Sequence, residues 1–403
     1  MSILVVHNGL VSLKLNKWLR RVHLWAGLLL GIPVVVLSLS LSGAALVFYN
    51  ELDGALNLPA TPACDSCSPP QLIAPRYDRA LHTLRQTYPD LNGPWRVEAS
   101  ERGRVIAARY YHPPATQGEY FAPLMVWLSA DGSAVVRQEY WGHYLMTWLY
   151  NLHFSLLSGA TGLVVVGMIG VGTTLLLLSG LLAWWPRPGQ WRRALAFKRR
   201  PALVGQLYDW HKVTGLVMVI PLVLLCVTGA MLALPKQTSW VLSQGFGPVN
   251  TPQPLFGQNA GGAKADTVPP AVALEQARSH YPTATLAWIE TPAVIGTPDY
   301  YRFRFSQQGD PSRRFPHTFV YISAADSTLL YSYDFHKQNH ATTIVNWLHA
   351  LHDGTYFGLA GRIFYVLAGM AMTILFILGA IRYYWRTCYK RRGDGSARHN
   401  TMP

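Results

Sequence analysis

The sequence contains two long apolar stretches that repeat each other 199 residues apart. The first stretch includes a run of about 30 residues without a charge, 156–185, which is long enough to cross a bilayer core of roughly 30 Å. Trp148, His153, Gly159, Gly162 and Gly180 recur as Trp347, His352, Gly358, Gly361 and Gly379. This spacing indicates an internal duplication inside a membrane, with a histidine at the same place in each half.

Four apolar segments have the length of a membrane span, near 24–49, 156–185, 213–234 and 357–384. The first is too long for the apolar core of a cleaved signal peptide, so we interpret it as an uncleaved anchor. Of the 34 Lys and Arg residues, 17 lie in the N-terminal stretch, the loop between the second and third segments and the C-terminal tail. The positive-inside rule places these three regions in the cytoplasm. The net charge of +14 is therefore a signal of topology and not of nucleic-acid binding.

The segments between the spans also repeat, and each is expected to lie in the periplasm. Each begins with a short amphipathic helix that ends at Tyr-Pro, at Tyr88-Pro89 and Tyr281-Pro282. Alternating strands follow, with turn signals at Asp131-Gly132 and Ala325-Asp326. A Gly-rich stretch, 255–267, is expected to be a loop.

The predicted fold class is an α-helical integral membrane protein with four transmembrane helices, arranged as two parallel span–α+β module–span repeats. We expect it in the bacterial inner membrane with both termini in the cytoplasm. The predicted segments are a cytoplasmic N-terminus 1–22, span 23–49, periplasmic module 50–143, span 144–186, cytoplasmic loop 187–207, span 208–234, periplasmic module 235–340, span 341–385 and cytoplasmic tail 386–403.

Four histidines occupy equivalent places in the two halves. His23 and His211 begin the outward spans, with Gly four residues and Pro ten residues later, and with Ser42-Gly43 and Thr228-Gly229 further along. His153 and His352 begin the inward spans. Equivalent residues of a parallel duplication face each other across an axis along the membrane normal. The sequence therefore predicts a His23–His211 pair at the cytoplasmic face and a His153–His352 pair at the outer face.

Two neutral imidazoles on opposite sides of a flat macrocycle are the ligand set of a bis-histidine haem. We therefore predict two haem b groups, one near each face, with His23, His211, His153 and His352 as axial ligands of the iron. A single histidine at a helix end is more often an interfacial residue, but the duplicated spacing favours ligation. No C-x-x-C-H motif for covalent haem attachment occurs.

His349 competes with His352 as the ligand on the last span. It lies three residues earlier and has Tyr150 as its counterpart in the first half. The repeat alignment favours His352, with His349 as a supporting or substrate-side group in the haem site. His143, His336 and His340 lie just outside the membrane, where each is either a surface residue or part of a site that an iron chelate approaches.

Other features have more than one reading. Pro33 and Pro221 are expected to kink their helices. Cys64 and Cys67 form C-D-S-C, which favours a local disulfide over a redox or metal-binding pair. Aromatic residues at both interfaces are typical membrane belts. The outer arginines Arg302, Arg304, Arg313 and Arg314 either meet an anionic ligand or lie on a solvated face of the sheet.

The order of span, helix-plus-hairpin module ending in Tyr-Pro, and L-H-x5-G-x2-G span resembles the PepSY-associated transmembrane-helix family. Within it, residues 14–390 are most similar to inner-membrane ferric-siderophore reductases of the ferrioxamine type. The resemblance implies PepSY-like modules, haem binding as in a b-type cytochrome, and a ferric siderophore as the periplasmic partner.

The leading hypothesis is an oxidoreductase that carries electrons from the cytoplasmic side to Fe(III)-siderophore during iron uptake. No G-x-G-x-x-G motif follows a strand, so a separate donor, a quinol or a cytoplasmic reductase, is required. The alternative is a haem-free, membrane-anchored PepSY-type binding or regulatory module. A transporter ranks last, because the spans carry no charged residue at mid-depth. No residue is assigned as catalytic.

Overall fold

The computed structural model describes residues 17–28, 33–57, 73–99, 105–186, 189–198, 201–252, 267–295, 298–312 and 314–389. The chain divides into two compact units. We call residues 1–48, 152–234 and 351–403 the helical unit, and residues 49–151 and 235–350 the sheet unit. Cys64, Cys67, Arg313 and most of the Gly-rich stretch lie outside the described residues.

Three segments of the described chain are long and apolar enough to cross a membrane. They are α6 (Gly159–Trp184), α8 (Leu203–Ala233) and Thr355–Thr387, which contains α12 (Gly358–Tyr384). A fourth span is reached only if the broken pair Val35–Leu46 and Tyr49–Asn57 counts as one. These pieces belong to α2 (Pro33–Leu46) and α3 (Tyr49–Asn57). The chain is therefore a multi-pass membrane protein with three spans, or up to four, among its described residues.

The two predicted inward spans, which contain His153 and His352, are both interrupted. In the first, α5 (Leu145–Ser155) stops before α6, and Leu156 and Leu157 have φ of 49° and 57°. In the second, α11 (His340–His352) is followed by a 3-10 turn, Thr355–Phe357, before α12. The prediction that His153 and His352 begin the long spans is therefore wrong, because left-handed turn residues end a short helix first. Each histidine lies at the end of that short helix.

Small residues bring the long helices of the helical unit close together. Gly167 and Gly170 of α6 face Leu234 and Ala230, and Gly369 of α12 faces the carbonyl of Ser40. A Cβ at Gly167 would lie 2.5 Å from Leu234, so the helices approach closely only because the side chain is absent. The buried core between these helices consists of Val36, Leu222, Ala368, Met372 and Leu375.

The sequence predicts a kink at each of two prolines, Pro33 and Pro221, and the structure places only the second inside a fully described helix. Pro221 lies inside α8, as predicted for a helix with a missing backbone donor. Pro33 is the first described residue of α2, and residues 29–32 before it lie outside the described residues, so the kink expected at Pro33 stays a prediction.

The sheet unit contains one eight-stranded antiparallel sheet with the order β4-β3-β2-β1-β5-β6-β7-β8. The strands are β1 (Trp95–Glu98), β2 (Val105–Tyr110), β3 (Leu124–Ser129), β4 (Val135–Tyr140), β5 (Thr285–Glu290), β6 (Tyr300–Ser306), β7 (Thr318–Ser323) and β8 (Leu329–Tyr333). Further short elements are the helix at 17–28, α7 (Trp191–Leu195), α9 (Pro235–Phe246), two 3-10 turns (Pro114–Thr116 and Phe335–Lys337) and a π-turn (Trp385–Tyr389).

The sequence predicts two separate α+β modules, whereas the structure joins them into one sheet. In the sheet, β1 is the inner edge strand of the first half and β5 is the inner edge strand of the second half. These two strands pair antiparallel, with Val97 opposite Ile289. The backbone N–H of Trp95 also donates to the hydroxyl of Thr291. Pairing β1 with β5 satisfies the backbone groups that would otherwise be exposed at the inner edge of each half.

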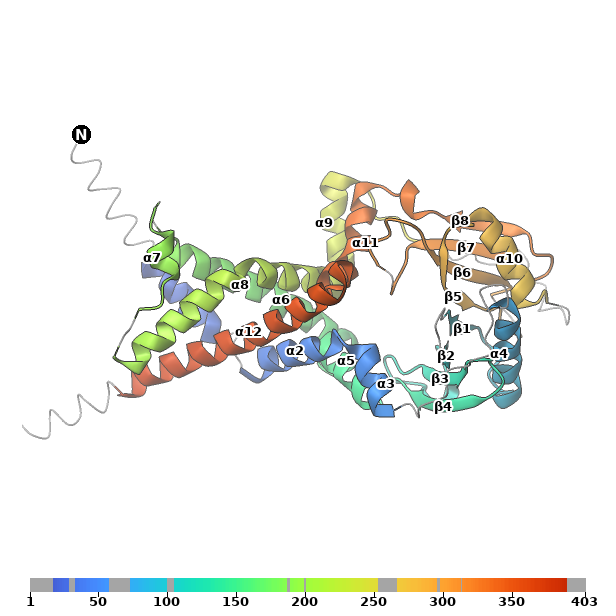
Figure 1. Ribbon diagram of the computed structural model, residues 1–403, viewed down its shortest axis with the longest axis horizontal. Coiled ribbons are helices and arrows are strands. Elements are labelled where there is room, and N and C mark those ends of the chain that lie inside the picture. Colours follow the sequence, from blue (N-terminus) through green and yellow to red (C-terminus); the bar gives the residue numbers. More distant parts are fainter. Residues whose placement is uncertain are drawn as a thin grey trace, which may run out of the picture. The chain divides into compact units, whose positions relative to one another are not determined.

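Helices α4 (Ile73–Thr87) and α10 (Pro270–His280) lie along one face of the sheet (Figure 1). Each ends just before its Tyr-Pro pair, as the sequence predicts. Alternation along the strands supplies the core beneath them, with Ile106 and Ala108 from β2 and Phe303 and Phe305 from β6. The opposite face of these strands therefore carries the residues in between.

The ion pair Arg137–Asp53 gives a test of packing in the sheet unit. The two side chains lie 3.1 Å apart and are only 9% and 8% exposed. We expect Asp53→Ala to lower the free energy of unfolding by about 3 kcal/mol, because the buried guanidinium of Arg137 keeps only the more exposed Glu139, 4.0 Å away. Thermal unfolding of the purified protein checks this. Arg79→Ala, which removes an exposed pair with Asp131, is the matched control and should cost less than about 1 kcal/mol.

Candidate functional site

Two pairs of imidazoles face each other in the helical unit, and each pair takes one histidine from each half of the chain. The ring centres of His23 and His211 are 6.2 Å apart, with the ring planes at 70°. Those of His153 and His352 are 6.1 Å apart, with the planes at 39°. The structure thus brings together the same two pairs that the repeat alignment predicts.

Backbone carbonyls and hydroxyls of neighbouring helices hold the rings by their Nδ1 atoms. Nδ1 of His23 donates to the carbonyl of Leu176 at 3.1 Å, that of His153 to Leu39 at 2.9 Å, and that of His211 to Leu375 at 3.0 Å. A carbonyl only accepts, so each of these rings carries its proton on Nδ1. The lone pair of these three rings is then on Nε2, the nitrogen through which imidazole commonly binds a metal.

A hydroxyl holds the fourth ring. Nδ1 of His352 lies 3.1 Å from the hydroxyl of Thr228, which itself donates to the carbonyl of Leu224 at 2.7 Å. The hydroxyl therefore accepts from Nδ1 of His352, and this ring has the same tautomer as the others. Ser42 and Ser179 contact Nδ1 of His153 and His23 in the same way.

Each imidazole lies directly against a glycine of the neighbouring helix. A Cβ built at Gly43 would be 2.6 Å from the ring of His153, at Gly180 2.6 Å from His23, and at Gly229 2.8 Å from His352. At Gly379 the corresponding distance to His211 is a normal contact of 3.6 Å. Three of the four rings therefore occupy space that exists only because the opposing residue has no side chain.

The two pairs lie near opposite ends of the helical unit. His211 and Gly229, which contacts His352, are both on α8 and are 18 residues apart in sequence. At 1.5 Å per residue this places the pairs about 27 Å apart along the helix. One pair therefore lies toward each side of a bilayer core that is roughly 30 Å thick.

His349 does not face His153. Its ring centre is 4.8 Å from that of Phe315, and both residues belong to the sheet unit. The structure thus gives His352 the position opposite His153, and places His349 one helical turn earlier among aromatic and cationic side chains.

The other histidines near this end of the chain have separate surroundings. His143 lies 3.3 Å from Glu119 and is half exposed. The ring of His336 packs on Phe335, in a turn whose N–H groups are capped by Asp334. His340 is the first residue of α11.

The sequence did not reveal the groups that orient the imidazoles. The carbonyls of Leu39, Leu176 and Leu375 carry no side-chain signal. The only hint was the repeated pair of a hydroxyl residue and a glycine, Ser42-Gly43 and Thr228-Gly229, where the hydroxyl bonds the ring and the glycine makes room for it.

Two facing imidazoles can bind one metal ion between them as axial ligands. Among the described residues, no group of three or more His, Cys, Asp or Glu side chains could hold a metal ion. Sites that rely on three or four protein ligands, such as those of zinc, are therefore absent from the described part of the chain. A pair of histidines fits a metal whose other ligands come from a cofactor.

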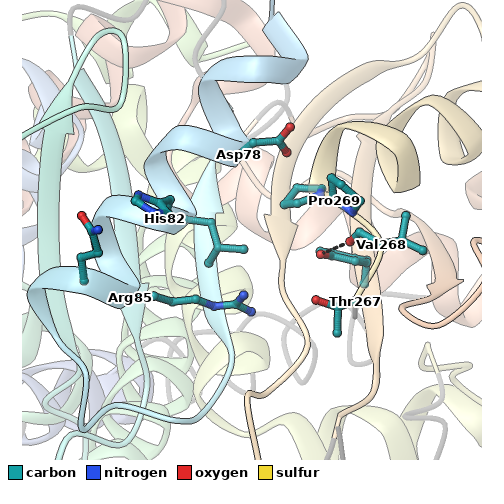
Figure 2. A pocket seen from close by; sticks show the side chains of 10 residues that line it. Asp78, His82, Arg85, Thr267, Val268 and Pro269 are labelled. Atoms are coloured by element: carbon teal, nitrogen blue, oxygen red, sulfur yellow. Dashed lines mark hydrogen bonds between the residues drawn. The ribbon is translucent and has the colours of Figure 1, made fainter. Parts of the chain in front are cut away.

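A second feature is a recess of about 330 Å³ in the sheet unit. Figure 2 shows Asp78, His82 and Arg85 of α4 on one side and Thr267, Val268 and Pro269 on the other. The carboxylate of Asp78 accepts from the backbone N–H of Ala271, and the hydroxyl of Tyr301 donates to the carbonyl of Val268. These bonds join the first residues of α10 to α4 and to the sheet, so we interpret the recess as part of the seam between the two halves.

Comparison with known protein families shows the family of the chain. The family model described as the PepSY-associated TM region matches residues 20–386. The chain belongs to this family. A search of curated proteins finds no matching relative.

His349 gives a test through pH. Burial, followed by the nearby charges of Arg314, His317 and Arg304, lowers its pKa from 6.5 to about 4. A histidine whose pKa is lowered in the folded state contributes stability above pH 6.5 that is lost as the pH falls toward 4. We expect the thermal midpoint to fall between pH 7.5 and 4.5, and to fall less in His349→Gln, with a difference of at most about 3 kcal/mol. Equal acid sensitivity of the two proteins would contradict the neutral, buried state of His349.

Proposed function

We propose that this protein is a di-haem b electron carrier of the bacterial inner membrane, with both termini in the cytoplasm. His23 and His211 would hold one haem near the cytoplasmic face, and His153 and His352 the other near the periplasmic face. The proposal extends to the reduction of Fe(III) in a siderophore complex, with release of Fe(II) during iron uptake.

The spacing of the imidazoles is the observation that carries this proposal. A metal–imidazole bond is about 2 Å long, and Nε2 lies about 1 Å from the ring centre. Two axial imidazoles on one iron therefore have ring centres about 6 Å apart, and the two pairs measure 6.2 and 6.1 Å. The same value at two duplicated sites supports a shared ligand set.

The surroundings of the pairs fit the same cofactor. Bound between two imidazoles, a haem supplies reversible one-electron chemistry without an open coordination position. The Nδ1 bonds fix the orientation of the rings and increase the basicity of Nε2. The four imidazoles are partly buried on apolar helices, which suits a cofactor that lies within the bilayer.

The electron balance defines the partners. Each Fe(III) that becomes Fe(II) takes one electron, which a cytoplasmic reductase or a membrane quinol must supply. The pairs lie about 27 Å apart along α8, so they divide the path across the bilayer into separate steps. The outer pair would pass the electron to the ferric chelate in the periplasm.

A visible absorption spectrum of the purified protein tests the cofactor. We expect sharp α and Soret bands of low-spin b haem after reduction, with about two haems per chain by pyridine haemochrome. Replacing one histidine of a pair with alanine should remove or convert to high spin one haem only. His336→Ala, a histidine outside both pairs, is the control and should retain both. A colourless protein prepared with haem available would favour the haem-free binding module instead.

The glycines give an independent test of the geometry. Gly43→Ala should lower the haem content by about one per chain, because its Cβ would lie 2.6 Å from the ring of His153. Gly54→Ala has nothing within 4 Å of its Cβ and should leave the haem content unchanged. If Gly43→Ala retains two low-spin haems with unshifted potentials, the ring of His153 does not occupy this position in the loaded protein.

A further inference from the structure

Five arginines share the face of the sheet that α4 and α10 do not cover. Alternation places them there, because their strand neighbours, such as Val97, Ala108 and Phe303, point into the core under the helices. These arginines are Arg96, Arg109, Arg137, Arg302 and Arg304. Arg314 follows in the segment between β6 and β7.

Carboxylates neutralise only half of these six cations. Arg96 pairs with Glu98, Arg137 with Asp53, and Arg302 with Glu290. Within the part of the chain that the structure describes, no ion pair involves Arg109, Arg304 or Arg314. The guanidinium carbon of each lies over an aromatic ring. The distances to the ring centre are 5.0 Å for Arg109 over Trp141, 4.2 Å for Arg304 over Trp288 and 5.3 Å for Arg314 over Tyr49.

One of these arginines, Arg314, acts on both members of a pair of repeat-equivalent residues, whereas Arg109 acts on one of them. The charges of Arg314 and Arg109 both act on Tyr150, and the charge of Arg314 also acts on His349. Tyr150 packs edge-on against Trp141 at 5.1 Å, which also lies under Arg109. The result is a cluster of cationic and aromatic groups whose neighbouring carboxylates have other partners. Asp53, whose charge acts on Tyr49, pairs with Arg137. Asp310, whose charge acts on Arg304, accepts a hydrogen bond from His317.

The cluster is connected to the outer histidine pair along two helices. Tyr150 precedes His153 by three residues on α5, and His349 precedes His352 by three residues on α11. Residues three apart lie on neighbouring faces one turn along a helix, a rise of about 4.5 Å. Tyr150 and His349 thus lie about one turn from His153 and His352, each on the same helix as its histidine.

We propose that Arg109 and Arg314 form the electron-exit site for an anionic ferric chelate, whose iron is held by carboxylate or phenolate oxygens. This inference rests on the proposed function and specifies its substrate class. A guanidinium fork binds carboxylate and phenolate oxygens through charge-assisted hydrogen bonds. The partly exposed rings of Tyr49 and Phe315 offer apolar contact for the chelate.

The charge of the site also favours the reaction. One electron passes to Fe(III), no bond of the chelator breaks, and the complex becomes more negative by one charge. Fixed positive groups bind this reduced complex better than the oxidised one, so they make the iron easier to reduce. Fe(II) then leaves its hard oxygen ligands more readily than Fe(III).

The test uses the full-length, haem-loaded protein, reduced and then mixed with ferric chelates of different charge. Ferric EDTA is the anionic probe and ferric ferrioxamine B the cationic probe. We expect haem reoxidation to be faster with ferric EDTA at low salt and to slow as the ionic strength rises. Arg109→Gln and Arg314→Gln should each lower its second-order rate constant roughly tenfold. Arg314→Lys should retain most of the rate.

Controls separate binding from folding and from electron transfer. Arg79→Gln, on α4, removes an exposed arginine from the covered side of the sheet and should change nothing. The gallium(III) complex of EDTA is redox-inert and accepts no electron from the protein. Quenching of tryptophan fluorescence by this complex therefore measures binding separately from electron transfer. We expect Arg109→Gln and Arg314→Gln to weaken this binding while their thermal midpoints stay unchanged.

The outcomes distinguish the two levels of the proposal. If anionic and cationic chelates reoxidise the haems equally fast, and the glutamine variants behave as the parent protein, the anionic substrate class is wrong and the proposed function stands. If none of the ferric chelates reoxidises the haems, the proposed function itself is overturned.

Discussion

The arrangement of the helical unit depends on one contact, an imidazole held against a glycine of the neighbouring helix. The contact needs two things at once: a residue without a Cβ, and a carbonyl or hydroxyl within reach of Nδ1. Gly43 with the carbonyl of Leu39 meets both needs for His153, and Gly180 with the carbonyl of Leu176 meets them for His23. Because a buried imidazole without a hydrogen-bond partner would be costly, the position of the ring and the register of the two helices determine each other.

Duplication explains why such contacts come in facing pairs, but the two halves are not equal everywhere. Gly379 leaves the ring of His211 1.0 Å more room than Gly180 leaves His23. In the span after the outer pair, Arg362 donates to the carbonyl of Val47, whereas its counterpart 199 residues earlier is Leu163. The second half also supplies Arg304 and Arg314. The repeat thus provides symmetric histidine pairs in asymmetric surroundings, which would allow two haems held as proposed to differ in potential.

Much of this could be predicted from the sequence, for identifiable reasons. The alternation in 300–305 was enough to place β6, and the turn at Asp131-Gly132 was enough to place the β3–β4 hairpin. The offset of 199 residues was enough to choose His352 over His349 as the residue that faces His153. The break after α5 was missed because Leu156 and Leu157 are ordinary helix formers that adopt positive φ only in this tertiary setting. The break after α11 has a sequence signal that was not used, Gly354, which adopts φ of 72° just after the helix ends. Strands β1 and β5 were missed because each is short and has buried residues on both faces of the sheet. Polar and apolar residues therefore alternate little along them.

The pairing of β1 with β5 has a consequence for biogenesis. During synthesis from the N-terminus, Val97 emerges almost two hundred residues before its partner Ile289. Until then the strand offers unsatisfied backbone groups at an open edge, which is a template for association with other chains. Two further membrane passages, α6 and α8, must be completed before that edge is closed. A cell that makes this protein therefore needs either rapid insertion of the second half or a chaperone that shields the first.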